Sequence, residues 1–367
     1  MKNIFPILVF TNRLICVIIT FRRYFFVLSC NFKICYRQIT LKGDFSAIMT
    51  TIRKYYVGID LGGTYIKGGI VDDKGEIILS NQVPTESEGG SEVVSKNIAA
   101  LATDLLEKCN LSLSDICGVG IGCPGMIDSK TGNVVYSGNL NWVDFNIANR
   151  VSELLSGVLV KVANDANVAA LGEVKFGAAK DYNSAVMITL GTGVGSGIVD
   201  NGVLIEGNKG AGSEFGHTVI HFGGEECTCG RRGCFEAYCS ATALIRDIKR
   251  AMVEHPDSKM WEIGDISKVC GKTAFDYAGV DEYARAVVDN YILNLACGIT
   301  NAANIFRPEI ILLGGGVCAQ GECLTKPLQQ ILDKDIFAGS RGPAVDIRIA
   351  MLGNSAGLLG AAALLMD

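Results

Sequence analysis

One histidine and three cysteines lie close together in residues 214–238, EFGHTVIHFGGEECTCGRRGCFEAY. His217 is followed by Cys227, Cys229 and Cys234, which gives the spacing H-x9-C-x-C-x4-C. One imidazole and three thiolates make a closed tetrahedral ligand set for Zn²⁺, and a closed set leaves no position open for catalysis. A redox dithiol would more usually have the spacing C-x-x-C. The pattern therefore predicts a structural zinc site, with unliganded surface cysteines as the alternative.

Two acidic residues flank this predicted zinc loop. Glu214 lies three residues before His217, and Glu236 lies two residues after Cys234. A histidine that binds zinc through one ring nitrogen keeps the other nitrogen for a hydrogen bond. We therefore expect the metal to hold Glu214, His217 and Glu236 as one rigid polar surface that contacts a ligand.

Asp165 is a candidate general base. It belongs to VKVANDANVAALGEVKFG, residues 160–177, in which a short apolar strand over 160–163 is followed by helix-forming residues. Asn164 or Asp165 is expected to cap this helix, and that structural role alone would explain an aspartate here. The stretch also falls between two similar halves of the chain, where a cleft is expected. Because a helix N-terminus keeps a carboxylate ionised, Asp165 could accept a proton from a hydroxyl bound in that cleft.

The two similar halves each begin with the same hairpin pattern. Residues 55–73 read YYVGIDLGGTYIKGGIVDD, and residues 185–202 read AVMITLGTGVGSGIVDNG. Each is an apolar run, a glycine-rich turn, a second apolar run and a polar turn, which is typical of a β-hairpin. The two patterns lie 129 residues apart when Leu61 is aligned with Leu190. An internal repeat of an α/β domain explains this spacing, so we expect two α/β domains that flank a cleft.

The glycine-rich turns of both hairpins suit phosphate binding. Glycine lets backbone N–H groups approach an anion without a Cβ in the way, and Thr64, Thr192 and Lys67 add further donors. Two equivalent turns favour one phosphate chain held between them over two plain hairpin turns. Neither turn has the G-x-x-x-x-G-K-[ST] motif or the dinucleotide-binding fingerprint. The residues expected at the turns are Gly62, Gly63, Thr64, Lys67, Gly191, Thr192 and Gly193.

Two further segments could contact a ligand. The apolar run at residues 308–313 leads into three glycines at 314–316, and glycines at the carboxyl end of a buried strand allow close approach of a flat or charged ligand. An ordinary strand-to-helix turn is the alternative. The polar loop SGNLNW, residues 137–142, includes Asn139 and suits sugar hydroxyls as well as it suits a plain surface loop.

The composition indicates a cytoplasmic protein with two domains. The 367 residues are 49% hydrophobic, which is enough for two cores. The formal net charge of −5 gives no indication of a nucleic-acid partner. The 14 cysteines are scattered singly outside the zinc loop, without the spacing of a disulfide framework, so we infer a reducing cytosol.

The first 48 residues differ in composition from the rest of the chain. They contain seven Lys or Arg but only one acidic residue, Asp44. Their apolar runs are each broken by Arg or Asn, and none reaches the ~20 residues that a membrane-spanning helix needs. No small-residue cleavage site follows the first run, so we expect neither a membrane anchor nor a signal peptide. We expect Met49 to be the natural start and residues 1–48 to be a non-native or disordered extension.

The motifs GIDLGGT, NDAN, LGTGVGSG, GSEFGH and CTCGRRGCFEAYCSA together resemble the ROK family of sugar kinases and repressors. The resemblance covers essentially all of residues 54–367 and implies the actin-like ATPase (ribonuclease H-like) fold, ATP with Mg²⁺, and a hexose as acceptor. It implies that Asp165 is the catalytic base and that Asp60 faces the magnesium ion. The expected sugar ligands are Asn139 of the polar loop, Asn164, Asp165, Glu214, His217 and Glu236. The zinc ligands are His217, Cys227, Cys229 and Cys234. The phosphates lie at Asp60, Gly62, Gly63, Thr64, Lys67, Gly191, Thr192 and Gly193, and the adenosine lies near Gly314, Gly315 and Gly316.

The resemblance also gives expectations about the substrate and the domains. CFEAYCSATAL is most similar to the bacterial glucokinases, whereas kinases of fructose, N-acetylmannosamine and N-acetylglucosamine share the other motifs. We therefore expect ATP-dependent phosphorylation of a hexose, with glucose favoured, by a homo-dimer or homo-tetramer. The smaller domain is expected in residues 49–169 plus 355–367, and the larger domain, with the zinc loop, in residues 170–354.

Two further expectations concern the alternatives to this picture. A sugar-sensing transcriptional repressor is the alternative of a different class, but family repressors carry a helix-turn-helix domain before the kinase-like body, and residues 1–48 show no such pattern.

The glycine turns lie outside the zinc loop in the sequence. We therefore expect loss of zinc to weaken sugar binding more than ATP binding.

Overall fold

The structure is a computed structural model that describes residues 6–11, 14–21, 24–28 and 54–366. The chain divides into two compact units, residues 1–52 and 53–367. The first unit contains β1 (Pro6–Thr11), β2 (Leu14–Phe21) and β3 (Tyr24–Leu28), which pair in this order as an antiparallel sheet. The expected start at Met49 lies outside the described residues, and the extension over residues 1–48 stays a prediction. Among the helices that the structure describes, none combines the length and the apolar character needed to cross a membrane.

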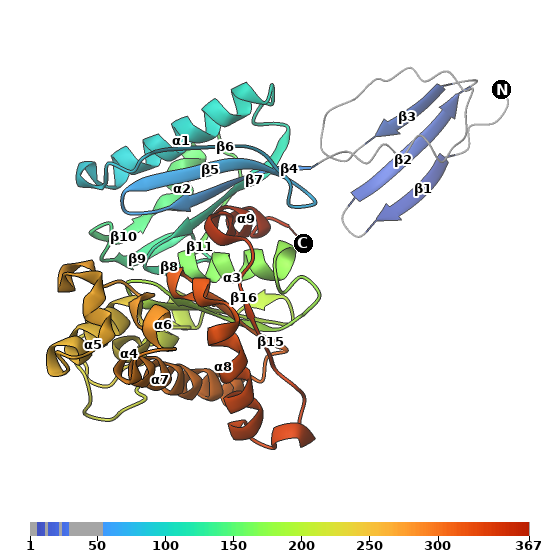
Figure 1. Cartoon of the computed structure of the whole chain (residues 1–367). Helices are drawn as coiled ribbons and strands as arrows, with labels where there is room; N and C mark the ends of the chain where they lie inside the picture. Colours follow the sequence, from blue (N-terminus) through green and yellow to red (C-terminus); the bar gives the residue numbers. More distant parts are fainter. Residues whose placement is uncertain (1–5, 12–13, 22–23, 29–53, 367) are drawn as a thin grey trace. The chain divides into compact units, whose positions relative to one another are not determined.

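The second unit contains two five-stranded mixed sheets (Figure 1). The strands of the first sheet are β4 (Tyr55–Leu61), β5 (Tyr65–Asp72), β6 (Ile77–Pro84), β7 (Ile116–Cys123) and β11 (Val160–Asn164). They are arranged in the order β11-β7-β4-β5-β6. The strands of the second sheet are β12 (Ala185–Leu190), β13 (Val194–Asp200), β14 (Val203–Leu204), β15 (Ile310–Gly314) and β16 (Asp346–Ile349). They are arranged in the order β14-β13-β12-β15-β16.

The two sheets share one topology. Numbered along the chain, the strands of both sheets follow the order 3-2-1-4-5. In both, the first three strands pair antiparallel, and the fourth and fifth add parallel to the first. The first two strands are the predicted hairpins, with Tyr55 opposite Asp72 in one and Ala185 opposite Val199 in the other. The internal repeat and the α/β class expected from the sequence are therefore confirmed.

Helices and one small sheet complete the second unit. The helices are α1 (Gly90–Lys108), α2 (Ile147–Leu154), α3 (Asp165–Phe176), α4 (Glu236–Cys239), α5 (Ala241–Glu254), α6 (Thr273–Tyr277), α7 (Glu282–Phe306), α8 (Glu322–Asp335) and α9 (Ala356–Ala363). The small antiparallel sheet is formed by β8 (Met126–Asp128), β9 (Asn133–Ser137) and β10 (Trp142–Asn146). Short 3₁₀ helices are η2 (Ser87–Gly89), η3 (Asn208–Gly210), η4 (Phe215–His217), η5 (Lys259–Ile263), η6 (Ile266–Lys268), η7 (Gly316–Gln320), η8 (Gly339–Arg341) and η9 (Gly353–Ser355).

Each large sheet has its own hydrophobic core. Val94, Ile98, Leu101 and Leu105 of α1 recur at three- and four-residue spacing, which places them on one helix face, and all four are buried against the first sheet. The second core gathers side chains of α5, α7 and α8 with those of β12, β13, β15 and β16, and the fully buried Phe235 lies within it. Two separate cores are what a repeated domain requires.

Helices α3 and α9 pack against each other between the two sheets (Figure 1). Helix α9 contacts β4 and β7 of the first sheet, and α3 contacts β12 and β13 of the second. Glycine makes this close approach possible, because a Cβ on Gly360 would overlap the backbone oxygen of Val168, and one on Gly120 would overlap that of Ala361. The expected domain boundaries stay a prediction, and the one at residue 169 falls inside α3, a helix that contacts both sheets.

Replacing Gly360 by alanine should destabilise the protein, because the new Cβ meets backbone that neither helix can move without disturbing a sheet. We expect the free energy of unfolding, measured by urea denaturation, to fall by about 1–3 kcal/mol. Gly279→Ala is the control, since a Cβ there has no atom within 4 Å; it should change the free energy of unfolding by less than about 1 kcal/mol. Equal effects of the two substitutions would contradict a backbone contact at Gly360.

Candidate active site

A cavity of about 1030 Å³ brings residues of both sheets together. The sequence-predicted residues that line it are Asp60, Lys67, Asn139, Asp165, Gly191, Thr192, Gly193, Glu214, His217, Glu236, Gly314, Gly315 and Gly316. Four predicted sugar or nucleotide ligands are not among its lining residues, namely Gly62, Gly63, Thr64 and Asn164, and neither are the predicted zinc ligands Cys227, Cys229 and Cys234. The carboxylates, the second glycine turn and the third glycine cluster therefore share one polar site.

Asn164 and Asp165 have different roles at the start of α3. The side-chain oxygen of Asn164 accepts hydrogen bonds from the backbone N–H groups of Ala166 (2.9 Å) and Asn167 (3.2 Å), so Asn164 is the N-cap. Its amide donates to the backbone oxygen of Gly125 (3.0 Å). Asp165 is the first helical residue and lines the cavity. Of the two residues that the sequence left open as the cap, the structure selects Asn164, and Asp165 is not needed for that purpose.

The environment of Asp165 changes its acidity. Burial raises the pKa of the Asp165 carboxyl above its ordinary value, although a hydrogen bond from the backbone N–H of Ala166 (2.9 Å) opposes the shift. Burial also raises the pKa of Asp60, which the charge of Lys67 opposes and the charge of Asp165 reinforces. Two carboxylates that repel each other in one cavity favour the binding of a cation there, and the raised pKa makes ionised Asp165 a stronger proton acceptor.

The first glycine turn is held by its own hairpin and by Thr85. The backbone N–H of Gly62 donates to the oxygen of Tyr65 (3.0 Å). The hydroxyl of Thr85 donates to the backbone oxygen of Gly62 (2.7 Å), and the N–H of Thr85 donates to that of Thr64 (2.9 Å). Gly63 and Thr64 are exposed. The fully buried Thr85 therefore holds a turn whose tip stays open to solvent, a role that no sequence pattern predicts.

The second glycine turn is held from outside by the start of α5. The backbone oxygen of Gly191 accepts a hydrogen bond from the N–H of Ala241 (2.8 Å). The backbone oxygen of Thr192 accepts one from the hydroxyl of Thr242 (2.8 Å). The start of α5 therefore holds two of the three carbonyl groups of this turn, and the third, that of Gly193, accepts a hydrogen bond from the N–H of Gly191 (3.0 Å).

The third glycine cluster follows β15 beside the second turn. Gly315 has a φ of 92°, a conformation that favours glycine, and a Cβ there would overlap the backbone of Leu190. The thiol of Cys318 donates to the backbone oxygen of Gly314 (3.1 Å). Glycine at residue 315 thus lets two strand ends meet closely at the edge of the cavity.

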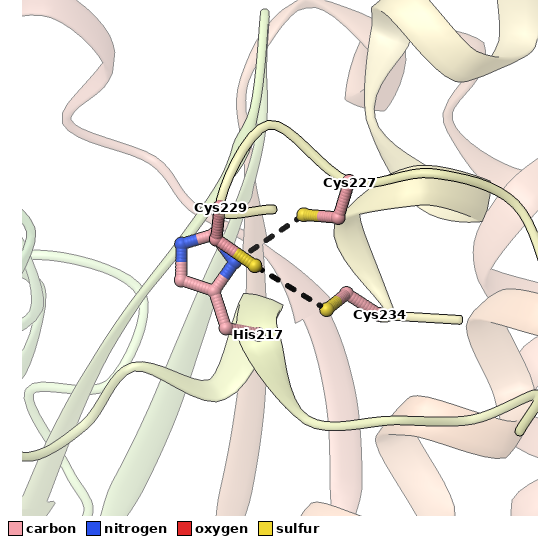
Figure 2. Close-up of side chains that lie close together, drawn as sticks. All are labelled: His217, Cys227, Cys229 and Cys234. Atoms are coloured by element: carbon pink, nitrogen blue, oxygen red, sulfur yellow. Dashed lines mark hydrogen bonds between the residues drawn. The ribbon is translucent and has the colours of Figure 1, made fainter. Parts of the chain in front are cut away.

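His217 and three cysteines form a cluster that could hold a metal ion (Figure 2). Their ligand atoms all lie within 4.8 Å of one another. The sulfurs of Cys229 and Cys234 are 3.7 Å apart, and Nδ1 of His217 lies 3.6 Å from the sulfur of Cys227. A tetrahedral zinc ion with bonds of about 2.3 Å to sulfur and about 2.0 Å to nitrogen has ligand-to-ligand distances of about 3.5–3.8 Å. The donor types and both distances fit zinc, and Figure 2 shows Nδ1 facing the sulfurs with Nε2 on the far side of the ring.

Glu236 connects this cluster to the second glycine turn. One carboxylate oxygen accepts a hydrogen bond from the backbone N–H of Val194 (3.0 Å), and the other accepts one from the hydroxyl of Thr228 in the cysteine loop (2.7 Å). A Cβ on Gly193 would lie 2.5 Å from the Glu236 carboxylate, so glycine leaves room for this carboxylate where the two segments meet. Glu236 therefore links the cysteine loop to the residue that follows the glycine turn, and the expected difference between sugar and ATP binding on loss of zinc stays a prediction.

The expected polar surface around the cluster lines one cavity. Glu214, His217 and Glu236 are all lining residues. Helix η4 brings the first two together, and the backbone N–H of His217 donates to the oxygen of Glu214 (3.1 Å). The roles of these three residues as sugar ligands stay a prediction.

Some lining residues had no signal in the sequence. Glu173 in the last turn of α3 is fully buried, and its carboxylate accepts hydrogen bonds from the backbone N–H groups of Ala178 (2.7 Å) and Leu352 (2.7 Å). It therefore ties α3 to the loop that precedes α9. A Cβ on Gly357 of α9 would lie 2.8 Å from the carboxylate carbon of Asp60. A glutamate at a helix end and a glycine in an apolar helix look ordinary until the fold brings them to the cavity.

Comparisons with known proteins agree over most of the chain. A model of the ROK family matches residues 56–367. The chain is 39% identical over 311 residues to a glucokinase from Halalkalibacterium halodurans, which covers 84% of this chain and 93% of that protein. It is 29% identical over 314 residues to the xylose repressor from Bacillus spizizenii, which covers 85% of this chain and 77% of that protein. It also resembles the crystal structure of a ROK family glucokinase from Streptomyces griseus in complex with glucose and AMPPNP, with a TM-score of 0.68 and 32% identity over 84% of this chain and 98% of that chain.

Elemental analysis of the purified full chain should find one zinc ion per chain at the His217 cluster. Cys229→Ser should lose the ion, because a neutral hydroxyl replaces a thiolate ligand, and the melting temperature should fall. Cys323→Ser is the control: Cys323 is an exposed free thiol on α8, and its loss should leave the zinc content unchanged. Zinc retained in Cys229→Ser, or lost equally in both variants, would contradict this ligand set.

Proposed function

The chain belongs to the ROK family, and from that premise we propose that it transfers a phosphoryl group from ATP to a hexose, with glucose as the preferred acceptor. The observation that carries the proposal is the position of Asp165. Its carboxylate stands at the head of α3 in one cavity with the second glycine turn and with Asp60. A base and anion-binding turns in one cavity are what a hydroxyl-directed kinase needs. The similarity to glucokinases supports glucose as the acceptor.

We propose that the two halves form an actin-like ATPase fold built from two ribonuclease H-like domains. The shared strand order and the position of α3 and α9 between the sheets support this assignment. The cavity draws its residues from both halves, so movement of one half toward the other would enclose the substrates. Closure of this kind excludes water and limits wasteful hydrolysis of ATP.

Asp165 takes the proton from the primary hydroxyl of the sugar as that oxygen approaches the γ-phosphorus in line. Its raised pKa supports this role, since a carboxylate that burial disfavours gains more from accepting a proton. Asn164 supplies the helix cap, so the carboxylate of Asp165 is available to the substrate. Most of the acceleration comes from holding the two reactants in place.

The phosphates bind to the glycine-rich turns. Backbone N–H groups of the turns and the ammonium of Lys67 donate to phosphate oxygens. Mg²⁺, when bound, spreads the negative charge of the phosphates, and Asp60 is the carboxylate in the cavity that would hold it. The adenosine lies near Gly314, Gly315 and Gly316, where the missing Cβ atoms allow close approach of a flat ring.

The sugar binds on the side of the cavity formed by the cysteine loop. Glu214, His217 and Glu236 come from around that loop and Asn139 from the loop between β9 and β10, and all four line the cavity and offer oxygen and nitrogen atoms to the sugar hydroxyls. Asn164 contributes less than its position in the sequence indicates, since its oxygen is used by the helix cap and one of its two amide hydrogens is used by Gly125. A structural zinc ion at the His217 cluster would hold His217 and the loop around Glu236 in place.

Two alternatives remain in view. Fructose, N-acetylmannosamine and N-acetylglucosamine are the other acceptors that the family motifs allow. A sugar-responsive repressor is the alternative of a different class, and the similarity to a xylose repressor supports it. The carboxylate in the cavity favours the kinase, because sensing a sugar does not require a base beside a phosphate turn.

We further propose a cytoplasmic homo-dimer or homo-tetramer. The eleven cysteines whose side chains the structure describes are all free thiols, as a reducing compartment would maintain them. No nucleic acid or membrane is part of the proposal.

An ADP-release assay with the full chain across glucose, fructose, N-acetylmannosamine, N-acetylglucosamine and xylose tests the reaction and the acceptor together. We expect the highest kcat/KM with glucose. A preference for an N-acetylhexosamine would change the acceptor and keep the reaction. Sugar binding without ADP release from any sugar would favour the repressor instead.

Asp165→Asn should lower kcat by at least ~10²-fold, the usual lower end for a general base, while glucose still binds. The folded-state pKa of Asp165 lies above its ordinary value, so ionisation at neutral pH costs the folded state free energy that an amide does not cost. The melting temperature of the ligand-free variant should therefore be equal to or higher than that of the wild type. Asp289→Asn, at an exposed position of α7, is the control that should leave kcat unchanged. Near-normal turnover in Asp165→Asn would remove Asp165 as the base.

A further inference from the structure

The second glycine turn, residues 191–193, has two successive carbonyl groups bound to the start of α5. The oxygen of Gly191 accepts from the backbone N–H of Ala241 (2.8 Å), and the oxygen of Thr192 accepts from the hydroxyl of Thr242 (2.8 Å). A helix N-terminus carries partial positive charge, which favours carbonyl oxygens there. The start of α5 thus draws both carbonyl oxygens to one side of the turn.

These two bonds determine where the N–H groups of the turn point. In a trans peptide the C=O and N–H groups point in opposite directions, and the described residues contain no cis peptide bond. The bond to the Gly191 oxygen therefore turns the N–H of Thr192 away from α5. The bond to the Thr192 oxygen does the same for the N–H of Gly193. Both Thr192 and Gly193 line the cavity, so the two N–H groups are available to an anion there.

Of the two peptides, Gly191–Thr192 and Thr192–Gly193, the second is held less firmly. The Gly191 oxygen is bound by a backbone N–H, which almost any residue at 241 would supply. The Thr192 oxygen depends on one side-chain hydroxyl, that of Thr242. Gly193 has no Cβ to oppose rotation of the peptide that precedes it, and its own carbonyl is held by the N–H of Gly191 (3.0 Å) on its other side. Without the hydroxyl, this carbonyl could turn into the cavity, where its oxygen would repel a phosphate.

We propose that Thr242 is a positioning residue for the nucleotide: its hydroxyl keeps the Thr192–Gly193 peptide oriented so that the N–H of Gly193 donates to a phosphate oxygen. This inference rests on the proposed function, which places ATP at this turn. Thr242 is not among the lining residues of the large cavity, so it acts through the turn and not by contact with the nucleotide. Its place in the sequence, after the cysteine loop, had indicated no role in ATP binding.

The first glycine turn also has a carbonyl group that a threonine hydroxyl holds. There the hydroxyl of Thr85 donates to the oxygen of Gly62 (2.7 Å), as the hydroxyl of Thr242 does to that of Thr192. Thr85 comes 23 residues after its partner, whereas Thr242 comes 50 residues after its own. The two bonded carbonyls are not at equivalent positions, because the 129-residue spacing of the repeat aligns Gly62 with Gly191 and not with Thr192. Each turn therefore has its own threonine hydroxyl that holds one of its peptides.

Two substitutions separate the hydroxyl from the shape of the side chain. Thr242→Val removes the hydroxyl and keeps the branched shape, whereas Thr242→Ser keeps the hydroxyl. Calorimetric titration of the full chain with MgADP and with adenosine separates phosphate binding from adenosine binding. We expect Thr242→Val to weaken MgADP binding about tenfold, the lower end for one lost hydrogen bond to a charged group. Adenosine binding should stay unchanged, and Thr242→Ser should bind MgADP like the wild type.

Kinetic and stability measurements distinguish a role in positioning the turn from a purely structural role of Thr242. In Thr242→Val, kcat/KM for ATP should fall about tenfold, by the same lost hydrogen bond, while KM for the hexose, the zinc content and the melting temperature stay unchanged. Wild-type affinity of Thr242→Val for MgADP would overturn the inference. An equal loss of adenosine, MgADP and hexose binding would also overturn it, since Thr242 would then only stabilise α5.

A third variant and the wild-type control separate failure of this inference from failure of the proposed function. Thr242→Ala repeats the test without the branched side chain if Thr242→Val does not fold, and it should show the same selective loss of MgADP binding. If the wild-type chain itself bound no MgADP, the proposed function would fail, and with it the premise of the inference. If the wild type binds MgADP and both hydroxyl-free variants match it, only the inference about Thr242 fails.

Discussion

The contact between the backbones of α3 and α9 is the constraint on which the rest of the structure depends. Gly360 lies against the backbone of Val168, where any side chain would force the helices apart. The same two helices carry the active-site groups, because α3 begins at Asp165 and α9 places Gly357 against the carboxylate of Asp60. The separation of the two halves and the positions of Asp60 and Asp165 therefore depend on one contact between helices.

The two ends of α3 differ in how their charged side chains are stabilised. At its head, Asn164 satisfies the helix N-terminus, while burial raises the pKa of Asp165 and of Asp60. Folded-state pKa values above the ordinary ones mean that the stability these groups provide in acid is lost as the pH rises through those values. At its tail, the fully buried Glu173 is compensated by two backbone N–H groups. The polar groups at the tail of α3 are thus paired by hydrogen bonds, whereas the carboxylate at its head is held where burial disfavours its charge.

The sequence predicts the parts of this protein whose partners are close along the chain. Both hairpins and the ligand set of the cysteine loop follow from local spacing and turn chemistry. The cap of α3 stayed open because Asn and Asp are both good N-caps, and only the extended backbone of Asn164 decides between them. Glu173 meets Leu352 across 179 residues, and Glu236 meets Val194 across 42, with no periodic signal to announce either pair. The link from the cysteine loop to the end of the second glycine turn was not predicted for this reason.

Helix α9 has a consequence for how the chain is made. It is the last helix along the described chain, yet it covers β4 and β7, which are among the earliest strands of its unit. During translation the first sheet leaves the ribosome long before residues 356–363 are synthesised, and pairing across so many residues carries a large loop-closure cost. One face of that sheet, with the backbone at Gly58 and Gly120 uncovered, must therefore wait until α9 has been synthesised. The nascent protein passes through a stage with open apolar strands, which is the stage at which chaperones and aggregation compete for it.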